Sequence, residues 1–212
     1  MLLFSSIILG CGLRTSPIDL KTEKEKGMRK LNVFNFVTLN GFFEGPNHDI
    51  SWHKHGGEEN KYSDDSLQAE NILLFGRRTY EMMYGFWPTP MAAEMFPETA
   101  KGMNKSEKIV FSNTLKKAEW NNTKVIGGNI VEEMTRLKKK KGNDMTILGS
   151  GSIVSLFADA GLIDEFQIMI DPVAIGNGTP IFNGIKEKLD LKLTEIKSFK
   201  SGIVLLSYQP NN

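Results

Sequence analysis

A glycine turn in the C-terminal half of the chain has the features of a phosphate-binding site. Residues 145–148 have the apolar run of a strand and lead through the turn into a helix pattern that begins near Ser152. Glycine lets the backbone approach a pyrophosphate closely, and the free N–H groups at a helix start carry partial positive charge. The residues that we expect to bind this phosphate are Gly149, Ser150, Gly151, Ser152 and Ile153. Taken alone, a Gly-x-Gly pair is also an ordinary turn.

A second candidate phosphate site lies at residues 76–79, with the sequence Gly-Arg-Arg-Thr, where the apolar strand 72–75 passes into another helix. Arginine guanidinium groups match phosphate oxygens, so this segment can hold a second phosphate such as the 2′-phosphate of NADP. Two solvated arginines would have the same sequence. Ser112 follows the apolar strand 108–111 and can assist the same phosphate. Ligands of open α/β sheets bind at the carboxyl ends of strands, and all these groups follow strands.

A Rossmann dehydrogenase is an alternative reading of the glycine turn. Asp171 follows Gly149-x-Gly151 at about the distance of a ribose-binding acid. The third glycine is missing, however, and only a short tail follows Asp171. The sequence therefore does not favour this architecture.

Residues 42–57 contain glycine, proline, asparagine and three histidines without hydrophobic periodicity, which is typical of a functional loop. His48, His53 and His55 can serve as acids or be exposed loop residues. No carboxylate stands at fixed helical spacing from them, so we expect no metal site.

Charge and cysteine content exclude several classes. The formal net charge is +1, so no global field attracts nucleic acid or an anionic membrane. Cys11 is the single cysteine, and neither a CxxC pair nor an HxExxH helix occurs. We therefore expect a small-molecule substrate, no nucleic-acid partner, and neither structural zinc nor a redox dithiol.

Residues 1–27 are predicted to be an N-terminal extension, disordered or preceding the true translation start. The segment Ile8-Leu9-Gly10-Cys11 loosely resembles a bacterial lipoprotein box, but no Lys or Arg precedes the apolar run. We therefore expect a cytoplasmic protein, with a membrane-anchored lipoprotein through Cys11 as the alternative.

The elements that must position these segments alternate along the rest of the chain. We expect helices at 63–69, from Gly76, after Asn129 and from Ser152. Strands are expected at 30–37, 72–75, 108–111, 124–126, 145–148 and 165–170, and a hairpin at 191–199 and 203–208. This order predicts an α/β fold with a mixed sheet flanked by helices, in one domain over residues 28–210.

Several of these segments resemble one known family. Residues 32–42 are similar to the first strand and turn of the riboflavin-pathway reductases. Residues 148–153, 161–166 and 172–182 resemble the C-terminal signature of that family. Residues 75–80 resemble the segment that binds the cofactor phosphate in dihydrofolate reductases. The resemblance covers residues 28–209. It implies a dihydrofolate-reductase-like α/β fold with a mixed, mostly parallel sheet flanked by helices and a C-terminal antiparallel hairpin.

The resemblance also implies an activity, that of an NADPH-dependent reductase similar to 5-amino-6-(5-phosphoribosylamino)uracil reductase, acting as a homodimer. Gly76, Arg77 and Thr79 would hold the adenosine-side phosphates with help from Ser112, and residues 149–153 would bind the pyrophosphate. Val37 and Thr38 would lie beside the nicotinamide. The protein would supply orientation and a proton for hydride transfer to a substrate carbon.

Asp49 is the predicted proton donor. The segment Asp49-Ile50-Ser51-Trp52 resembles the one that carries the substrate-binding carboxylate in dihydrofolate reductases. A partly desolvated aspartate can protonate or clamp a substrate, although a loop aspartate in a turn is the simpler explanation.

Two departures from the family leave the substrate open. The HxE and PCxxC motifs of the accompanying zinc deaminase do not occur, and the loop rich in His and Trp differs from that of a riboflavin enzyme. A reductase of another pterin or carbonyl substrate, or a non-catalytic nucleotide-binding protein, are therefore alternative functions.

Overall fold

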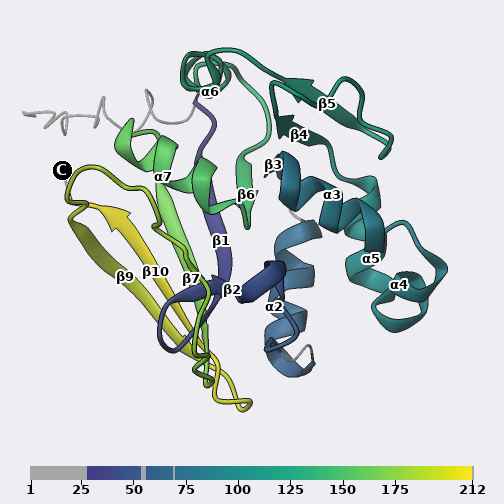
Figure 1. The fold of residues 1–212 in the computed structure, drawn as a ribbon, viewed down its shortest axis with the longest axis vertical. Helices are drawn as coiled ribbons and strands as arrows, with labels where there is room; N and C mark the ends of the chain where they lie inside the picture. The colour runs from purple at the N-terminus through teal and green to yellow at the C-terminus, as the bar shows by residue number, and fades with distance from the viewer. Residues whose placement is uncertain (1–27, 54–55, 69, 212) are drawn as a thin grey trace, which may run out of the picture.

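The computed structural model describes residues 28–53, 56–68 and 70–211, and these form one layered α/β unit (Figure 1). Its sheet has the strand order β5-β4-β3-β6-β1-β7-β10-β9. The strands are β1 (Leu31–Thr38), β3 (Ile72–Gly76), β4 (Lys108–Phe111), β5 (Thr123–Ile126), β6 (Met145–Leu148), β7 (Glu165–Asp171), β9 (Leu191–Ser198) and β10 (Val204–Pro210). Neighbouring strands pair in parallel from β5 through β4, β3, β6 and β1 to β7. Strand β10 is antiparallel to both β7 and β9.

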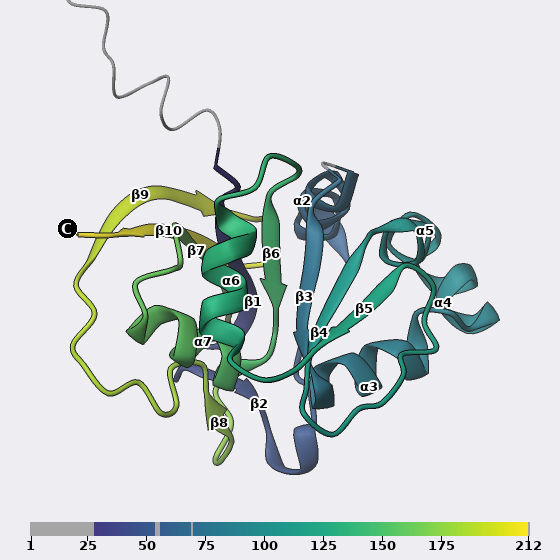
Figure 2. The same ribbon diagram turned by 90° about the horizontal axis from the view of Figure 1, so that it is seen from above.

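The helices cover both faces of the sheet. They are the 3-10 helix η1 (Pro46–His48), α2 (Gly57–Gln68), α3 (Arg77–Phe86), α4 (Pro90–Met95), α5 (Pro97–Lys105), α6 (Ile130–Lys138) and α7 (Gly151–Asp159). Figure 1 shows α6 and α7 on one side of the sheet and α2 to α5 on the other. A separate two-stranded pair, β2 (Phe42–Glu44) with β8 (Thr179–Pro180), lies near the carboxyl ends of the central strands (Figure 2).

The hydrophobic core differs on the two faces of the sheet. On one face, Ile72 and Leu74 join a large cluster that includes Phe157 of α7 and Met134 of α6. On the other face, the alternate residues of the same strands belong to two smaller clusters. One contains Leu73, Phe75, Tyr80, Met103, Val110 and Trp120 near α3 and α5, and the other contains Phe34, Met169, Phe199, Ile203 and Leu205 near α2. The central strands are therefore apolar on both faces, as parallel strands between two helical layers must be.

The predicted fold class is confirmed, including the mostly parallel sheet and the C-terminal hairpin. The prediction missed α4 and α5 and placed the start of α2 six positions late, at residue 63 rather than Gly57. Both missed helices carry the usual start signal of proline in the first turn, and Thr89 caps α4 by accepting a hydrogen bond from the amide of Ala92. The first turn of α2 is polar and acidic, so it shows little apolar periodicity.

The predicted extension at residues 1–27 lies outside the described residues. Within the described ranges, no helix is long and apolar enough to cross a membrane.

Lys108 is an unusual core residue because its side chain is charged and almost wholly buried. Its Nζ donates hydrogen bonds to the carbonyl oxygens of Met103 (2.8 Å) and Ser106 (2.6 Å), and it lies 4.6 Å from the ring centre of Trp120. These contacts place the ammonium group at the end of α5, where the carbonyl groups are negative. Burial nevertheless lowers the pKa of Lys108 to about 8, because the charged form loses its hydration.

We predict that Lys108 makes stability rise with pH. The lysine of the unfolded chain keeps its ordinary pKa of 10.5, so between about pH 8 and 10.5 the unfolded state binds more protons than the folded state, and raising the pH favours folding. The full gain is on the order of 3 kcal/mol. Urea unfolding of the wild type and of Lys108→Met at pH 7 and pH 10 measures this gain in unfolding free energy. The wild type should gain stability relative to the variant, and an unchanged difference would contradict the prediction.

Candidate active site

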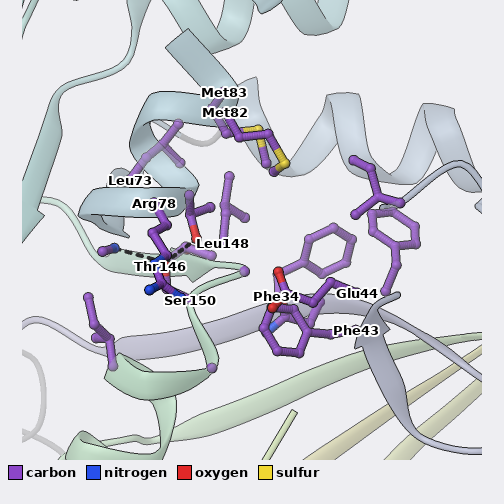
Figure 3. A pocket seen from close by; sticks show the side chains of 18 of the residues that line it. Phe34, Phe43, Glu44, Leu73, Arg78, Met82, Met83, Thr146, Leu148 and Ser150 are labelled. Atoms are coloured by element: carbon purple, nitrogen blue, oxygen red, sulfur yellow. Dashed lines mark hydrogen bonds between the residues drawn. The ribbon is translucent and has the colours of Figure 1, made fainter. Parts of the chain in front are cut away.

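A cavity of about 1360 Å³ opens on the sheet face that carries α2 and α3. Its floor includes Phe34 of β1, Leu73 of β3, and Thr146 and Leu148 of β6 (Figure 3). Leu148 packs against both small core clusters of this face. The cavity therefore lies over the centre of the sheet, between these two clusters.

The rim of the cavity is built from the turns that follow β3 and β6. These strands are parallel neighbours, with Leu74 opposite Ile147, so their carboxyl ends lie side by side. The hydroxyl of Ser150 accepts a hydrogen bond from the amide of Gly76 (2.8 Å) and donates one to Oγ1 of Thr79 (2.7 Å). The two predicted phosphate-binding segments are thus joined into a single rim, with the start of α7 on one side and the start of α3 on the other.

Steric crowding and backbone conformation explain why the turn after β6 contains two glycines. Gly149 has φ +63°, and a Cβ added there would lie 3.0 Å from Cγ2 of Thr79. A Cβ at Gly151 would lie 2.9 Å from Cε1 of Phe43. Ser150 has φ 62° and is a rare non-glycine residue in the left-handed region, which costs about 1–3 kcal/mol. The turn therefore has no room for a side chain at Gly149 or Gly151.

Arg77 and Arg78 provide positive charge at this rim. Both are exposed and line the cavity, and Nη1 of Arg77 lies 3.2 Å from Oε1 of Glu81. Figure 3 shows Arg78 beside Ser150. Guanidinium groups, hydroxyls and the positive end of α7 together form an environment suited to phosphate.

The structure brings most of the predicted cofactor-binding residues together. Those that line the cavity are Gly76, Arg77, Thr79, Gly149, Ser150, Gly151, Ser152 and Ile153. Their role in cofactor binding stays a prediction.

Three other predicted cofactor residues lie outside the cavity lining. The side chain of Val37 belongs to the core on the opposite face of the sheet. Thr38 is fully buried, and its hydroxyl donates to Oδ1 of Asn40 and accepts from the amide of Phe42. The hydroxyl of Ser112 accepts hydrogen bonds from the two amides of residues 114 and 115. These hydroxyls shape turns, and the role of the three residues in cofactor binding stays a prediction.

Asp49, the predicted proton donor, also lies outside the cavity lining. It is exposed, and Oδ1 accepts a hydrogen bond from the amide of Ser51 (2.9 Å). This bond lowers the pKa of Asp49 because it stabilises the carboxylate, which favours the form that has no proton to give. The position fits the simpler explanation, a loop aspartate in a turn.

His53 and Asp171 form a buried pair that the sequence did not predict. Nδ1 of His53 lies 2.9 Å from Oδ1 of Asp171, and the two side chains are only 5% and 4% exposed. His53 lines the cavity. A loop histidine and a strand-end aspartate 118 residues apart give no shared pattern in the sequence, so this contact could be found only in the folded chain.

The far wall of the cavity is apolar. Figure 3 shows Met82 and Met83 of α3 across the cavity from Phe34 and Phe43. The apolar wall, as we call it, consists of Met82, Met83, Phe86, Trp87, Met95, Phe96 and Met103. It is formed mainly by α3 and the two helices that the sequence prediction missed.

Comparison with known proteins identifies the family. The model of the RibD C-terminal domain matches residues 29–205. The chain belongs to the RibD C-terminal domain family. Within the chain's sequence relatives, uncharacterized protein YyaP of Bacillus subtilis (strain 168) is 33% identical over 175 residues, which cover 82% of this chain and 92% of YyaP. The predicted resemblance to the riboflavin-pathway reductases is thereby confirmed.

Solved structures share the fold of this RibD C-terminal domain protein at low sequence identity. One is a diaminohydroxyphosphoribosylaminopyrimidine deaminase/5-amino-6-(5-phosphoribosylamino)uracil reductase of Thermotoga maritima, with a TM-score of 0.63 and 14% identity. The match covers 90% of this chain and 58% of that one. Another is dihydrofolate reductase of Enterococcus faecalis complexed with NADP(H), with a TM-score of 0.54 and 18% identity, covering 86% and 97% of the two chains. The fold is thus that of dihydrofolate reductase.

We predict that the hydroxyl of Ser150 stabilises the rim, although the left-handed backbone of this residue is strained. Ser150→Ala removes both hydrogen bonds and leaves the Gly76 amide without this partner, which should cost about 1–3 kcal/mol of unfolding free energy. Ser150→Gly loses the same bonds but adopts the left-handed conformation without strain, so it should be about 1 kcal/mol more stable than the alanine variant. Urea unfolding of the wild type and the two variants measures the loss of the hydrogen bonds and the backbone strain. An alanine variant at least as stable as the glycine variant would contradict the assigned strain.

Proposed function

We propose that this RibD C-terminal domain protein is an NADPH-dependent reductase of a small ring-containing substrate. The observation that carries the proposal is the joined rim, in which the Ser150 hydroxyl is hydrogen-bonded to both Gly76 and Thr79 next to two arginines. A rim of this kind can hold the several negative charges of a phosphorylated dinucleotide. The cavity behind it is large enough for a nicotinamide and a substrate side by side.

The residues at the rim fit this cofactor. The amides at the start of α7 and the hydroxyl of Thr79 would hold the pyrophosphate, and Arg77 and Arg78 would hold the 2′-phosphate. When bound, the reduced nicotinamide supplies a hydride. The chain itself orients the substrate against the floor of the cavity and keeps water away from it with the apolar wall.

Two substrate classes are compatible with this activity. The name of the Thermotoga maritima reductase gives a phosphoribosylaminouracil as the compound it acts on. The same class of substrate is one candidate here. The second candidate is an uncharged pterin or carbonyl compound. The lining of the cavity favours the second candidate. Arg77 and Arg78 at the rim are the only lysine or arginine side chains among the described lining residues, and the far wall is apolar. If the cofactor occupies both arginines, the described part of the cavity offers a substrate phosphate no further fixed positive charge.

We predict that NADPH binds more tightly than NADH and that the arginines are the reason. Arg77→Ala and Arg78→Ala should each weaken NADPH binding by about 10- to 100-fold, as expected for a lost charge-assisted phosphate contact, and should leave NADH binding nearly unchanged. Fluorescence titration measures both affinities. Arg136→Ala is the matched control, because Arg136 is an exposed arginine paired with Glu133 on α6. No NADPH binding by the wild type, or no loss in either variant, would remove the cofactor assignment.

We also predict that substrates without phosphate are reduced faster. The experiment follows NADPH absorbance with pairs of ring compounds that differ only in a phosphoribosyl or ribosyl group. The apolar wall should favour the unphosphorylated member of each pair by about 10-fold or more in kcat/KM, since burying a phosphate against apolar side chains is costly. A preference for the phosphorylated uracil would instead support the riboflavin-pathway substrate.

A further inference from the structure

A row of apolar side chains crosses the C-terminal part of the sheet and ends at its open edge. The pairing places Ile168 of β7 opposite Leu206 of β10, and Leu206 opposite Ile196 of β9. Directly opposed residues of antiparallel strands share a face, and Ile168 belongs to the core cluster that includes Phe157 of α7. The exposed fraction rises along this row, from 8% at Ile168 to 61% at Ile196. The row is therefore core at one end and bare at the other.

The backbone of β9 is also open on its outer side. Figure 1 shows β9 at the margin of the sheet, and no strand of the described residues pairs with its outer side. The amide of Phe199 donates to the carbonyl oxygen of Ile203 across the hairpin. Because the backbone groups of an antiparallel strand point alternately to its two sides, those of Ile196 and Ser198 point away from β10. Such a row of outward N–H and C=O groups is a template for another strand.

The side chains of β9 make this edge complementary to itself. An antiparallel pair of two identical strands, related by a two-fold axis, is centred on one residue that lies opposite its own copy. Centring on Ile196 brings the two isoleucines together on the apolar face. The same register places Glu195 opposite Lys197 of the second copy, twice, on the other face, where Lys197 lies beside the core residue Leu205. Opposite charges at directly opposed positions stabilise a strand pair.

The other registers lack this complementarity. Centring on Glu195 or on Lys197 would place like charges directly opposite each other, which is destabilising. Centring on Thr194 would place Ile196 opposite Lys192. Centring on Ser198 would place Ile196 opposite a lysine as well, at position 200. The sequence of β9 therefore selects one register.

Lysines on an edge strand often prevent pairing of this kind, but those of β9 are placed differently. Nζ of Lys197 lies 4.8 Å from the ring centre of Tyr62, so this side chain folds over its own chain. Thr194 is the extra residue of a bulge in the β9–β10 pairing, and a bulge bends its strand. The pairing is therefore confined to residues 194–198, and Lys192 and Lys200 lie outside it.

We propose that the open edge of β9 binds the same edge of a second copy of this chain, in antiparallel pairing centred on Ile196. The two eight-stranded sheets join into one continuous sheet, and the row from Ile168 to Ile196 continues into the row of the second copy. No residue of β9 or β10 is among the described lining residues of the cavity. The contact thus leaves the candidate active site open, and this inference does not depend on the proposed function.

The first test measures the oligomeric state of the full chain by analytical ultracentrifugation. The wild type should be a dimer. Ile196→Lys places two like charges at the centre of the contact and should raise the dissociation constant of the dimer by about 100-fold or more. Ile196→Pro should have a similar effect, because it removes an outward N–H that β10 does not use. Met91→Lys is the matched control, since Met91 is 62% exposed on α4, at the opposite margin of the molecule (Figures 1 and 2).

The second test examines the register. Glu195→Lys and Lys197→Glu should each raise the dissociation constant by about 10-fold, because each turns two attractive pairs into repulsive ones. The double exchange Glu195→Lys with Lys197→Glu should return the constant to within about three-fold of the wild type, since the same pairs form with their charges reversed. Damage to the hairpin would not be repaired in this way.

The outcomes are distinguishable. Circular dichroism and urea unfolding identify any variant that fails to fold, and the two substitutions at Ile196 and the charge exchange test the contact independently. A monomeric wild type would overturn the proposal. A dimer that folded Ile196→Lys and Ile196→Pro leave unchanged would overturn it too, because the contact would then lie elsewhere. A dimer that Ile196→Lys dissociates but the double exchange does not restore would show that the register centred on Ile196 is wrong.

Discussion

The hydrogen bonds of the Ser150 hydroxyl hold the candidate active site together. They join the turn after β6 to the start of α3, and they can form only because β3 and β6 are parallel neighbours that end at the same edge of the sheet. In the same turn Gly149 lies against Thr79, Gly151 lies against Phe43, and Ser150 has a left-handed backbone. Together with the β3–β6 pairing, these bonds fix the start of α3 relative to the start of α7.

The cavity results from the way the second face of the sheet is covered. Helices α6 and α7 close the first face with one continuous cluster, but the side chains of the other face gather in two clusters, near α2 and near α3 and α5. The central strands β6 and β1 between them remain accessible and form the floor. The same alternation of side chains that builds the core thus decides which residues of each strand face a ligand.

Local signals in the sequence were enough to predict the fold and the glycine turns, because strand length, glycine and helix caps depend on near neighbours. They could not decide which face of β1 meets the cavity, since both faces of this strand are apolar. Val37 and Thr38 came from the family resemblance, and the aromatic residues Phe34 and Phe36, which line the cavity, were not predicted. His53 and Asp171 were missed as a pair for a related reason, because only the packing of a loop against β7 brings them together.

The two arginines that hold the cofactor in the proposed function lie outside the packed core of the fold. Arg77 and Arg78 are exposed residues in the first turn of α3 and belong to none of the core clusters. Ser150, by contrast, is buried and tied to two neighbouring segments. In the proposed function, exchange of these arginines is open to natural drift and to protein engineering, and would retune which dinucleotide binds while the turn beneath stays as it is.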